Sequence, residues 1–201
     1  MNEEDQIVHA TGPLLEGATV RYVTDAKSSK FFVKAFSTGL LSAFGHNPTI
    51  AIRNFQGDAS YSTNGGALEG ARVSIRIQAD SLEVADDVSD KDRLEINHRM
   101  HSEVLGTDRF PEIVYECSRV NASGAGDRYW VALNGDLTLH GVTQSMPISA
   151  RVVIEGDSLR ASGEFTVRQS EYEIAQVSAA GGAIRVKDEL KCTFDIVARR
   201  Q

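Results

Sequence analysis

Apolar and polar residues alternate in one stretch of the chain after another. Near the C-terminus, the apolar positions of one such stretch are Leu190, Cys192, Phe194, Ile196 and Ala198. A period of two residues is typical of a β-strand with one buried face. A succession of such strands, interrupted by a single helical segment, predicts an all-β fold in which an antiparallel sheet closes, or nearly closes, around its apolar face.

Polar, turn-forming residues divide these stretches into individual strands. Thr19–Thr24 and residues 30–36 are rich in Val, Tyr and Phe, and the polar segment 25–29 between them predicts a first hairpin. Residues 49–60 predict one further strand. Its alternation changes phase near Asn54, which is typical of a β-bulge.

Residues 89–105 carry the signals of a helix instead. Ser89 stands where an N-cap residue is expected, Asp92 follows three residues later as in a capping box, and Gly106 is typical of a helix C-terminus. One face of this helix is charged and should be solvated. Another line along the helix places two histidines between two leucines: Leu94, His98, His101 and Leu105.

The length and charge of the chain limit its organisation and its partners. With 201 residues it fits one large β domain, residues 18–201, and the sparse apolar content of residues 1–17 predicts a flexible arm. The net charge is -7 and the basic residues are dispersed, which argues against a nucleic-acid partner. The chain opens with acidic residues and contains no apolar run long enough for a signal peptide or a membrane span, so we expect a cytoplasmic location.

Motifs of the common enzyme and cofactor classes do not occur in the sequence. Cys117 and Cys192 fall at apolar positions of expected strands, so we predict buried free thiols rather than nucleophiles. The acidic residues in the segment 86–92 lack the spacing of an EF-hand loop. Because Gly-x-Ser-x-Gly, phosphate-binding Gly-rich and Cys-x-x-Cys motifs do not occur, we expect no cofactor.

Several segments, in order along the chain, resemble those of a known family. Residues 135–143, Gly-Asp-Leu-Thr-Leu-His-Gly-Val-Thr, are similar to the Gly-x-Leu-Thr-Ile/Leu-His-Gly-Val-Thr segment of the YceI-like family. Residues 52–57, 79–84, 110–115 and 168–174 resemble further segments of the same family. The resemblance implies a lipocalin-like antiparallel β-barrel, with one α-helix near the barrel mouth, around a cavity that binds lipid.

Some features differ from the family pattern. Many members carry an export signal, whereas this chain opens with an acidic arm. Many also place a histidine before a Leu-Gly pair, whereas here His46 follows Phe44 and Gly45. The loop after residues 168–174 has a longer Ala- and Gly-rich stretch than the family pattern.

The resemblance favours a non-enzymatic protein that binds, sequesters or transports an isoprenoid or another long-chain lipid. Each CH₂ group buried in an apolar lumen contributes about 0.8 kcal/mol, so a chain-like ligand binds without any catalytic group. We expect the helix and the turn at Phe44 to lie near the opening of the barrel. The predicted ligand-binding residues are Phe44, His46, Leu94, His98, His101, Leu105 and Tyr172.

The histidines leave an enzyme open as an alternative. His98 and His101 are three residues apart on the helix, a spacing at which they can share a metal ion, with Glu95 or His46 as further ligands. We predict instead that the pair supplies polar groups at the cavity mouth or in the core, without metal. We interpret His140, which precedes a glycine in an expected turn, as a structural hydrogen-bonding residue.

A third hypothesis is a barrel filled by its own side chains that acts in protein association. The sequence is also compatible with a homodimer, and it does not identify the ligand or its head group.

Overall fold

The computed structural model describes residues 19–38, 47–63, 68–179 and 184–201. The expected arm 1–17 lies outside them. The strands are β1 (Thr19–Thr24), β2 (Lys30–Lys34), β3 (Ser37–Thr38), β4 (Thr49–Ile52), β5 (Phe55–Ser62), β6 (Arg72–Gln78), β7 (Leu82–Val84), β8 (Glu112–Cys117), β9 (Val120–Ala125), β10 (Arg128–Leu139), β11 (Val142–Glu155), β12 (Ser158–Arg168), β13 (Ser178–Ala179), β14 (Ile184–Val186) and β15 (Glu189–Arg200). The helix α1 (Asp90–Arg99) continues into a π-helical turn, Met100–Leu105.

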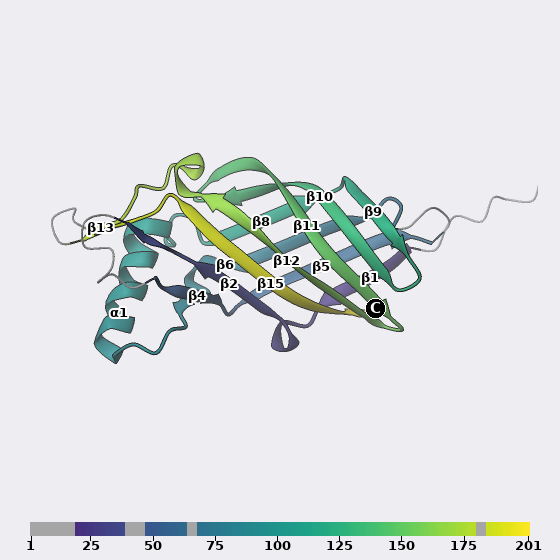
Figure 1. Ribbon diagram of the computed structural model, residues 1–201, viewed down its shortest axis with the longest axis horizontal. Helices are drawn as coiled ribbons and strands as arrows, with labels where there is room; N and C mark the ends of the chain where they lie inside the picture. Colours follow the sequence, from purple (N-terminus) through teal and green to yellow (C-terminus); the bar gives the residue numbers. More distant parts are fainter. Residues whose placement is uncertain (1–18, 39–46, 64–67, 180–183) are drawn as a thin grey trace, which may run out of the picture.

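Within these residues, eight strands form a closed antiparallel barrel (Figure 1). Their order is β1-β5-β6-β8-β10-β11-β12-β15, and pairing between β15 and β1 closes the ring. In Figure 1, α1 lies at one end of the barrel and the hairpin of β9 and β10 reaches the opposite end. The predicted fold class, an antiparallel β-barrel with one helix, is confirmed.

The first two strands do not form the expected hairpin. Both pair with β15 instead: β1 with residues 198–200 and β2 with residues 191–195. The two strands therefore follow one line along β15, and a short 3₁₀ turn bulges out between them. Ser29 bridges this interruption, because its hydroxyl accepts from the Val197 N–H at 2.9 Å and donates to the Asp25 carbonyl at 2.7 Å. The turn-forming residues thus mark a bulge rather than a reversal of the chain.

The expected strand 49–60 is divided between two strands. β4 pairs with β2 and β7, whereas β5 pairs with β1 and β6. The change of phase near Asn54 is a strand break at which the chain changes its neighbours, so the prediction of a bulge within one strand was wrong.

The helix begins and ends as the sequence predicts. The Ser89 hydroxyl accepts from the Asp92 N–H at 3.2 Å, which satisfies one of the backbone donors left free in the first turn. At the other end, Gly106 has a φ of 55° and follows the π-helical turn.

Polar side chains hold the helix on β7. Asn97 Oδ1 accepts from the Val84 N–H at 2.9 Å, and the Arg93 guanidinium donates to the Val84 carbonyl at 2.5 Å. None of the residues of α1 itself is buried, whereas Leu105 in the following turn is. The helix is therefore held at the end of the barrel by these polar contacts and by Ile96, which packs against the larger cluster, while Met100, Val104 and Leu105 of the following turn add further apolar contacts.

His140 and Gly141 form the two-residue turn between β10 and β11. Their φ values of 53° and 77° are both positive, as a type I′ turn requires. The His140 ring lies 4.4 Å from the Phe110 ring between centroids, and its Nδ1 donates to the Tyr172 carbonyl at 3.2 Å. His140 links the hairpin to two neighbouring segments, which confirms its predicted structural role.

Two clusters of buried side chains fill much of the barrel interior. The larger one lies toward the helix and includes Val84, Leu105, Leu139, Tyr172 and Ile174. The smaller one includes Val20, Tyr22, Val131, Val152 and Leu159. Val120, Leu133 and Phe194 pack against both clusters.

Cys117 and Cys192 are buried free thiols of the larger cluster, as predicted. Burial raises the pKa of the Cys192 thiol to about 12, so the thiol stays protonated at neutral pH.

Two buried tyrosines differ in their hydrogen bonding. The Tyr115 hydroxyl lies 3.1 Å from the Met146 carbonyl and 3.4 Å from the Leu133 carbonyl, and donates toward them. Tyr172 is fully buried, and its hydroxyl has no partner among the described residues. A buried hydroxyl without a partner costs free energy that a paired one does not.

We expect Gly141→Ala to destabilise the protein more than Gly106→Ala. Both glycines have a left-handed conformation, which costs about 1–2 kcal/mol for alanine. A Cβ on Gly141 would lie 2.6 Å from the Phe110 ring, whereas one on Gly106 would lie at an ordinary 3.5 Å from it. Chemical denaturation should show a loss of unfolding free energy at least ~1 kcal/mol larger for Gly141→Ala. Equal losses would show that Phe110 does not restrain this turn.

We expect Tyr172→Phe to leave the free energy of unfolding unchanged or to raise it by up to ~1 kcal/mol, because it removes a hydroxyl without a partner. Tyr115→Phe is the matched control, since it removes a paired hydroxyl and should cost ~1 kcal/mol. Urea denaturation of both variants measures the difference. A loss of stability in Tyr172→Phe as large as in Tyr115→Phe would contradict the assignment of an unpaired hydroxyl.

Candidate functional site

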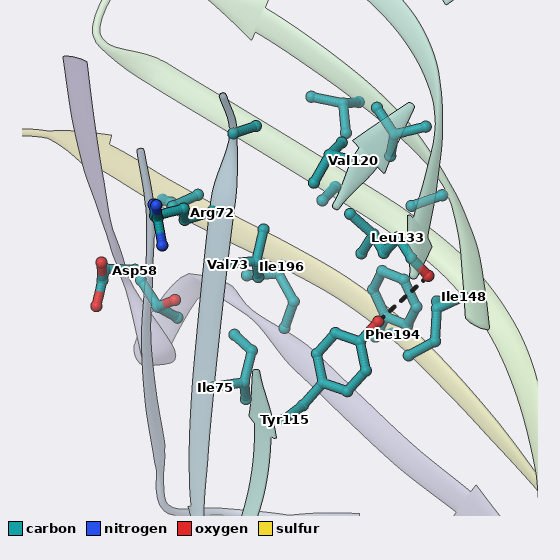
Figure 2. Close-up of a pocket in the computed structure, with 18 of the residues that line it drawn as sticks. Asp58, Arg72, Val73, Ile75, Tyr115, Val120, Leu133, Ile148, Phe194 and Ile196 are labelled. Atoms are coloured by element: carbon teal, nitrogen blue, oxygen red, sulfur yellow. Dashed lines mark hydrogen bonds between the residues drawn. The ribbon is translucent and has the colours of Figure 1, made fainter. Parts of the chain in front are cut away.

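An apolar cavity of about 160 Å³ lies inside the barrel. All eight barrel strands contribute residues to its lining. Figure 2 shows the side chains of Ile75, Tyr115, Leu133, Ile148, Phe194 and Ile196 around this space. The inward positions that alternate along the strands therefore enclose a space that they do not fill completely.

The cavity lies where the two buried clusters meet. Its lining takes Ile77 and Leu137 from the larger cluster and Val131 and Leu159 from the smaller one. Five of the seven buried residues of the smaller cluster line the cavity: Val131, Ala150, Val152, Leu159 and Ala198. The empty space therefore extends among the residues of the smaller cluster as well as along its boundary with the larger one.

Glycines at inward positions help to keep this space open. Gly163 is paired with Phe194 and Gly57 with Ile75, and a Cβ on either glycine would come within 3 Å of that partner's side chain. In each pair, the larger side chain thus lies over the glycine, in the space that a Cβ would occupy.

Three phenylalanines form a group of rings on the cavity wall. Phe31, Phe165 and Phe194 are in mutual edge-to-face or tilted contact, with centroid distances of 6.2–6.3 Å. All three are only half-buried. Because these rings border empty space, no close-packed neighbour fixes them on that side.

Tyr115 supplies a polar atom to the cavity wall. Figure 2 shows its hydroxyl pointing to the Leu133 carbonyl. Burial raises the pKa of this phenol above its ordinary value of 10.0, so the hydroxyl is neutral at physiological pH. The cavity therefore combines apolar walls with a neutral hydroxyl whose proton is already shared with backbone carbonyls.

A polar groove on the outer wall meets the cavity where β8 passes into β9. The pairing of β6 with β8 ends at Val73 and Cys117, and β9 pairs with β10 on one side without a described partner on the other. Ala71 and Val120 line both the cavity and the groove. The other residues along the groove are Gly70, Ser118, Arg119, Asn121, Asn134, Ser145 and Pro147.

The predicted line of helix residues lies away from this cavity. Leu94 is 71% exposed and His98 is also exposed. The Nε2 of His101 lies 2.8 Å from the Leu82 carbonyl and is hydrogen-bonded to it. Leu105 is buried in the larger cluster. The helix thus presents its first two predicted residues to solvent and uses the last two to attach itself to the barrel.

Of the remaining predicted residues, only Tyr172 is described, and it does not line the cavity. Tyr172 belongs to the larger cluster, while Phe44 and His46 lie outside the described residues. Contact of a ligand with any of the predicted residues stays a prediction.

The described ranges contain no group of three or more His, Cys, Asp or Glu side chains arranged to hold a metal ion. In the same ranges, no helix is long and apolar enough to cross a membrane.

The sequence predicted that apolar residues line the barrel, but it did not predict where in the barrel the cavity lies. The pairing of Gly163 with Phe194 is informative only when the register of β12 and β15 is known. The groove has a weak local signal, because Ser118 and Arg119 interrupt the alternation between Cys117 and Val120. This interruption marks the junction between β8 and β9.

Comparison with known proteins agrees with this architecture. The family model of the YceI-like domain matches residues 22–198. A UPF0312 protein of Shewanella baltica is 27% identical over 136 residues, which are 67% of this chain and 63% of that relative. The chain thus matches less than two thirds of the length of this curated relative.

Solved structures share the fold at low sequence identity. BcnA of Burkholderia cenocepacia has a TM-score of 0.64 at 16% identity, with 87% of this chain and 98% of that chain covered. A polyisoprenoid binding domain from Saccharophagus degradans has a TM-score of 0.64 at 14% identity, with 90% and 98% covered. Since the family model spans nearly the whole barrel, the chain belongs to the YceI-like domain family.

Proposed function

We propose that this protein binds an isoprenoid or another long-chain lipid inside its barrel, as a non-enzymatic carrier. The observation that carries the proposal is the apolar cavity, to which all eight barrel strands contribute. The structural neighbour from Saccharophagus degradans is described as a polyisoprenoid binding domain, which supports the same ligand class here.

The size of the cavity limits how much of a lipid it holds as it stands. An apolar cavity of about 150 Å³ holds one benzene molecule. The present cavity, about 160 Å³, therefore has room for roughly one isoprene unit. Burying about five carbons contributes ~4 kcal/mol, which alone corresponds to about millimolar binding.

Tighter binding requires the barrel to accommodate more of the chain. The half-buried rings of Phe31, Phe165 and Phe194 are the side chains best placed to move, because they face the void. Each further CH₂ group that enters adds about 0.8 kcal/mol, before the cost of moving the rings. The affinity of the protein therefore depends on how far these rings move apart.

The described geometry supports binding better than catalysis by the histidine pair. His98 is exposed on the helix, outside the cavity lining. His101 uses its Nε2 in a hydrogen bond to a backbone carbonyl, which holds the ring in place. Transport, a cytoplasmic location and a homodimer stay predictions.

Extraction of the purified protein with organic solvent under denaturing conditions should release an isoprenoid or acyl lipid, which mass spectrometry identifies. We expect up to one lipid per chain, because the apolar cavity is one continuous space. A parallel extract of an unrelated protein from the same host controls for lipid carried through purification. An empty extract, together with no uptake of added prenol by the protein, would overturn the proposal.

We expect Ala161→Leu to weaken binding of a radiolabelled prenol. Ala161 lines the cavity, and the larger side chain would take up a large part of the free volume. Loss of space for about three CH₂ groups corresponds to roughly 10- to 100-fold weaker binding. Ala132→Leu is the matched control, since Ala132 is exposed on β10 and outside the cavity lining. Equal affinities of the two variants would place the prenol outside this cavity.

A further inference from the structure

We propose that the groove at the junction of β8 and β9 binds the anionic head group of the lipid, a phosphate or diphosphate ester, while the chain occupies the cavity. This inference rests on the proposed function and assigns a second part of the same site.

The position of the groove is the first argument. Ala71 and Val120 line both spaces, so the groove and the cavity adjoin at these two residues. A chain longer than one isoprene unit does not fit within about 160 Å³, so the remainder leaves the barrel unless the rings on the cavity wall move apart to admit it. The pairing of β6 with β8 ends at Val73, two residues from Ala71. Among the described residues, a lipid chain that passes between Ala71 and Val120 therefore breaks no hydrogen bond of the β6–β8 pairing.

The groove also has the chemistry that an anion requires. Arg119 is the one charged residue among the groove residues, and Ser118, Asn121, Asn134 and Ser145 add neutral hydrogen-bond donors. An arginine binds phosphate oxygens through two parallel N–H donors, and amide and hydroxyl groups extend such a site.

These side chains are free to bind a ligand. Among the residues that the structure describes, the side chains of Arg119, Asn121 and Asn134 make no hydrogen bond or ion pair with the protein. Only the backbone carbonyl of Arg119 is engaged: it accepts from the Asn134 N–H at 2.9 Å and from the Cys117 thiol at 3.5 Å. A substitution of the Arg119 side chain therefore leaves both of these backbone contacts in place.

Acidic residues lie in an adjacent groove, not in this one. That neighbouring groove is lined in part by Asp58, Glu116 and Asp136. Asp58 is paired with Arg21 at 3.5 Å, and Glu116 with Arg76 at 3.4 Å. Arg76 also contacts Glu112 at 3.6 Å, so it is shared between two carboxylates. The charge of Asp58 is thus balanced and that of Glu116 in part, which reduces the repulsion of an anion in the first groove.

The test compares a prenyl monophosphate with the prenol of the same chain length. Wild-type protein should bind the phosphate more tightly, and added salt should weaken the phosphate complex but not the prenol complex. In Arg119→Gln, affinity for the prenyl monophosphate should fall about fivefold, as for a solvent-exposed ion pair. Affinity for the prenol should stay unchanged.

Arg128→Gln is the matched control. Arg128 lies on β10 with a side chain that is 77% exposed, and it lines neither the cavity nor the groove. Its removal changes the net charge by the same amount, so affinity for the prenyl monophosphate should stay within about twofold of wild type.

The outcomes separate this inference from the proposed function. Equal affinities of the wild type for prenyl monophosphate and prenol would overturn the head-group site and leave the proposed lipid-binding function intact. So would an Arg119→Gln variant whose affinity for prenyl monophosphate is unchanged. Binding of neither prenyl compound would overturn both. Inorganic phosphate that binds as tightly as prenyl monophosphate, and competes with it, would overturn the head-group assignment in favour of a site for free phosphate.

Discussion

Hydrogen bonds between β15 and its neighbours on both sides close the barrel, and the enclosed interior exists because of this closure. β15 pairs with β12 along almost its whole length on one side and with β1 and β2 in succession on the other. An open sheet of this size would leave a row of unpaired backbone groups at each edge. The arrangement tolerates an interruption on the β1–β2 side because the Ser29 hydroxyl replaces the missing partner of the Val197 N–H.

Closure fixes the circumference, and the choice of side chains then decides how much of the interior is filled. An eight-stranded barrel is just wide enough for its own side chains to fill. Here small inward residues such as Ala150 and Ala161 leave part of the interior empty. At about 24 cal/mol per Å³, a cavity of about 160 Å³ costs ~4 kcal/mol of stability. A ligand that fills the cavity recovers much of this cost, so the empty space favours binding as much as the apolar walls do.

The alternation of residues predicted the closed antiparallel sheet and the buried thiols, and the capping residues Ser89 and Gly106 predicted the ends of the helix, because each depends on local sequence. It did not predict how strands meet: polar residues 25–29 suit a hairpin turn and a bulge equally well, and the choice between them depends on β15, far away in the sequence. The same limit applies to the site. Whether an inward position faces a neighbour or empty space depends on register, as between Gly163 and Phe194, so the cavity could not be located from the helix and its histidines.

The cavity and the groove together define a ligand with two chemically different parts. Apolar walls stabilise a hydrocarbon chain but give no advantage to a charge, which would lose its hydration there. A charged end must therefore remain at the surface, and it is held best where polar groups lie next to the entrance. The wall provides this at the junction of β8 and β9, where the ladder to β6 ends and Arg119 lies beside Val120. In the proposed complex, the interruption of the barrel wall lets the charged end of the lipid remain in water while its chain lies in the barrel.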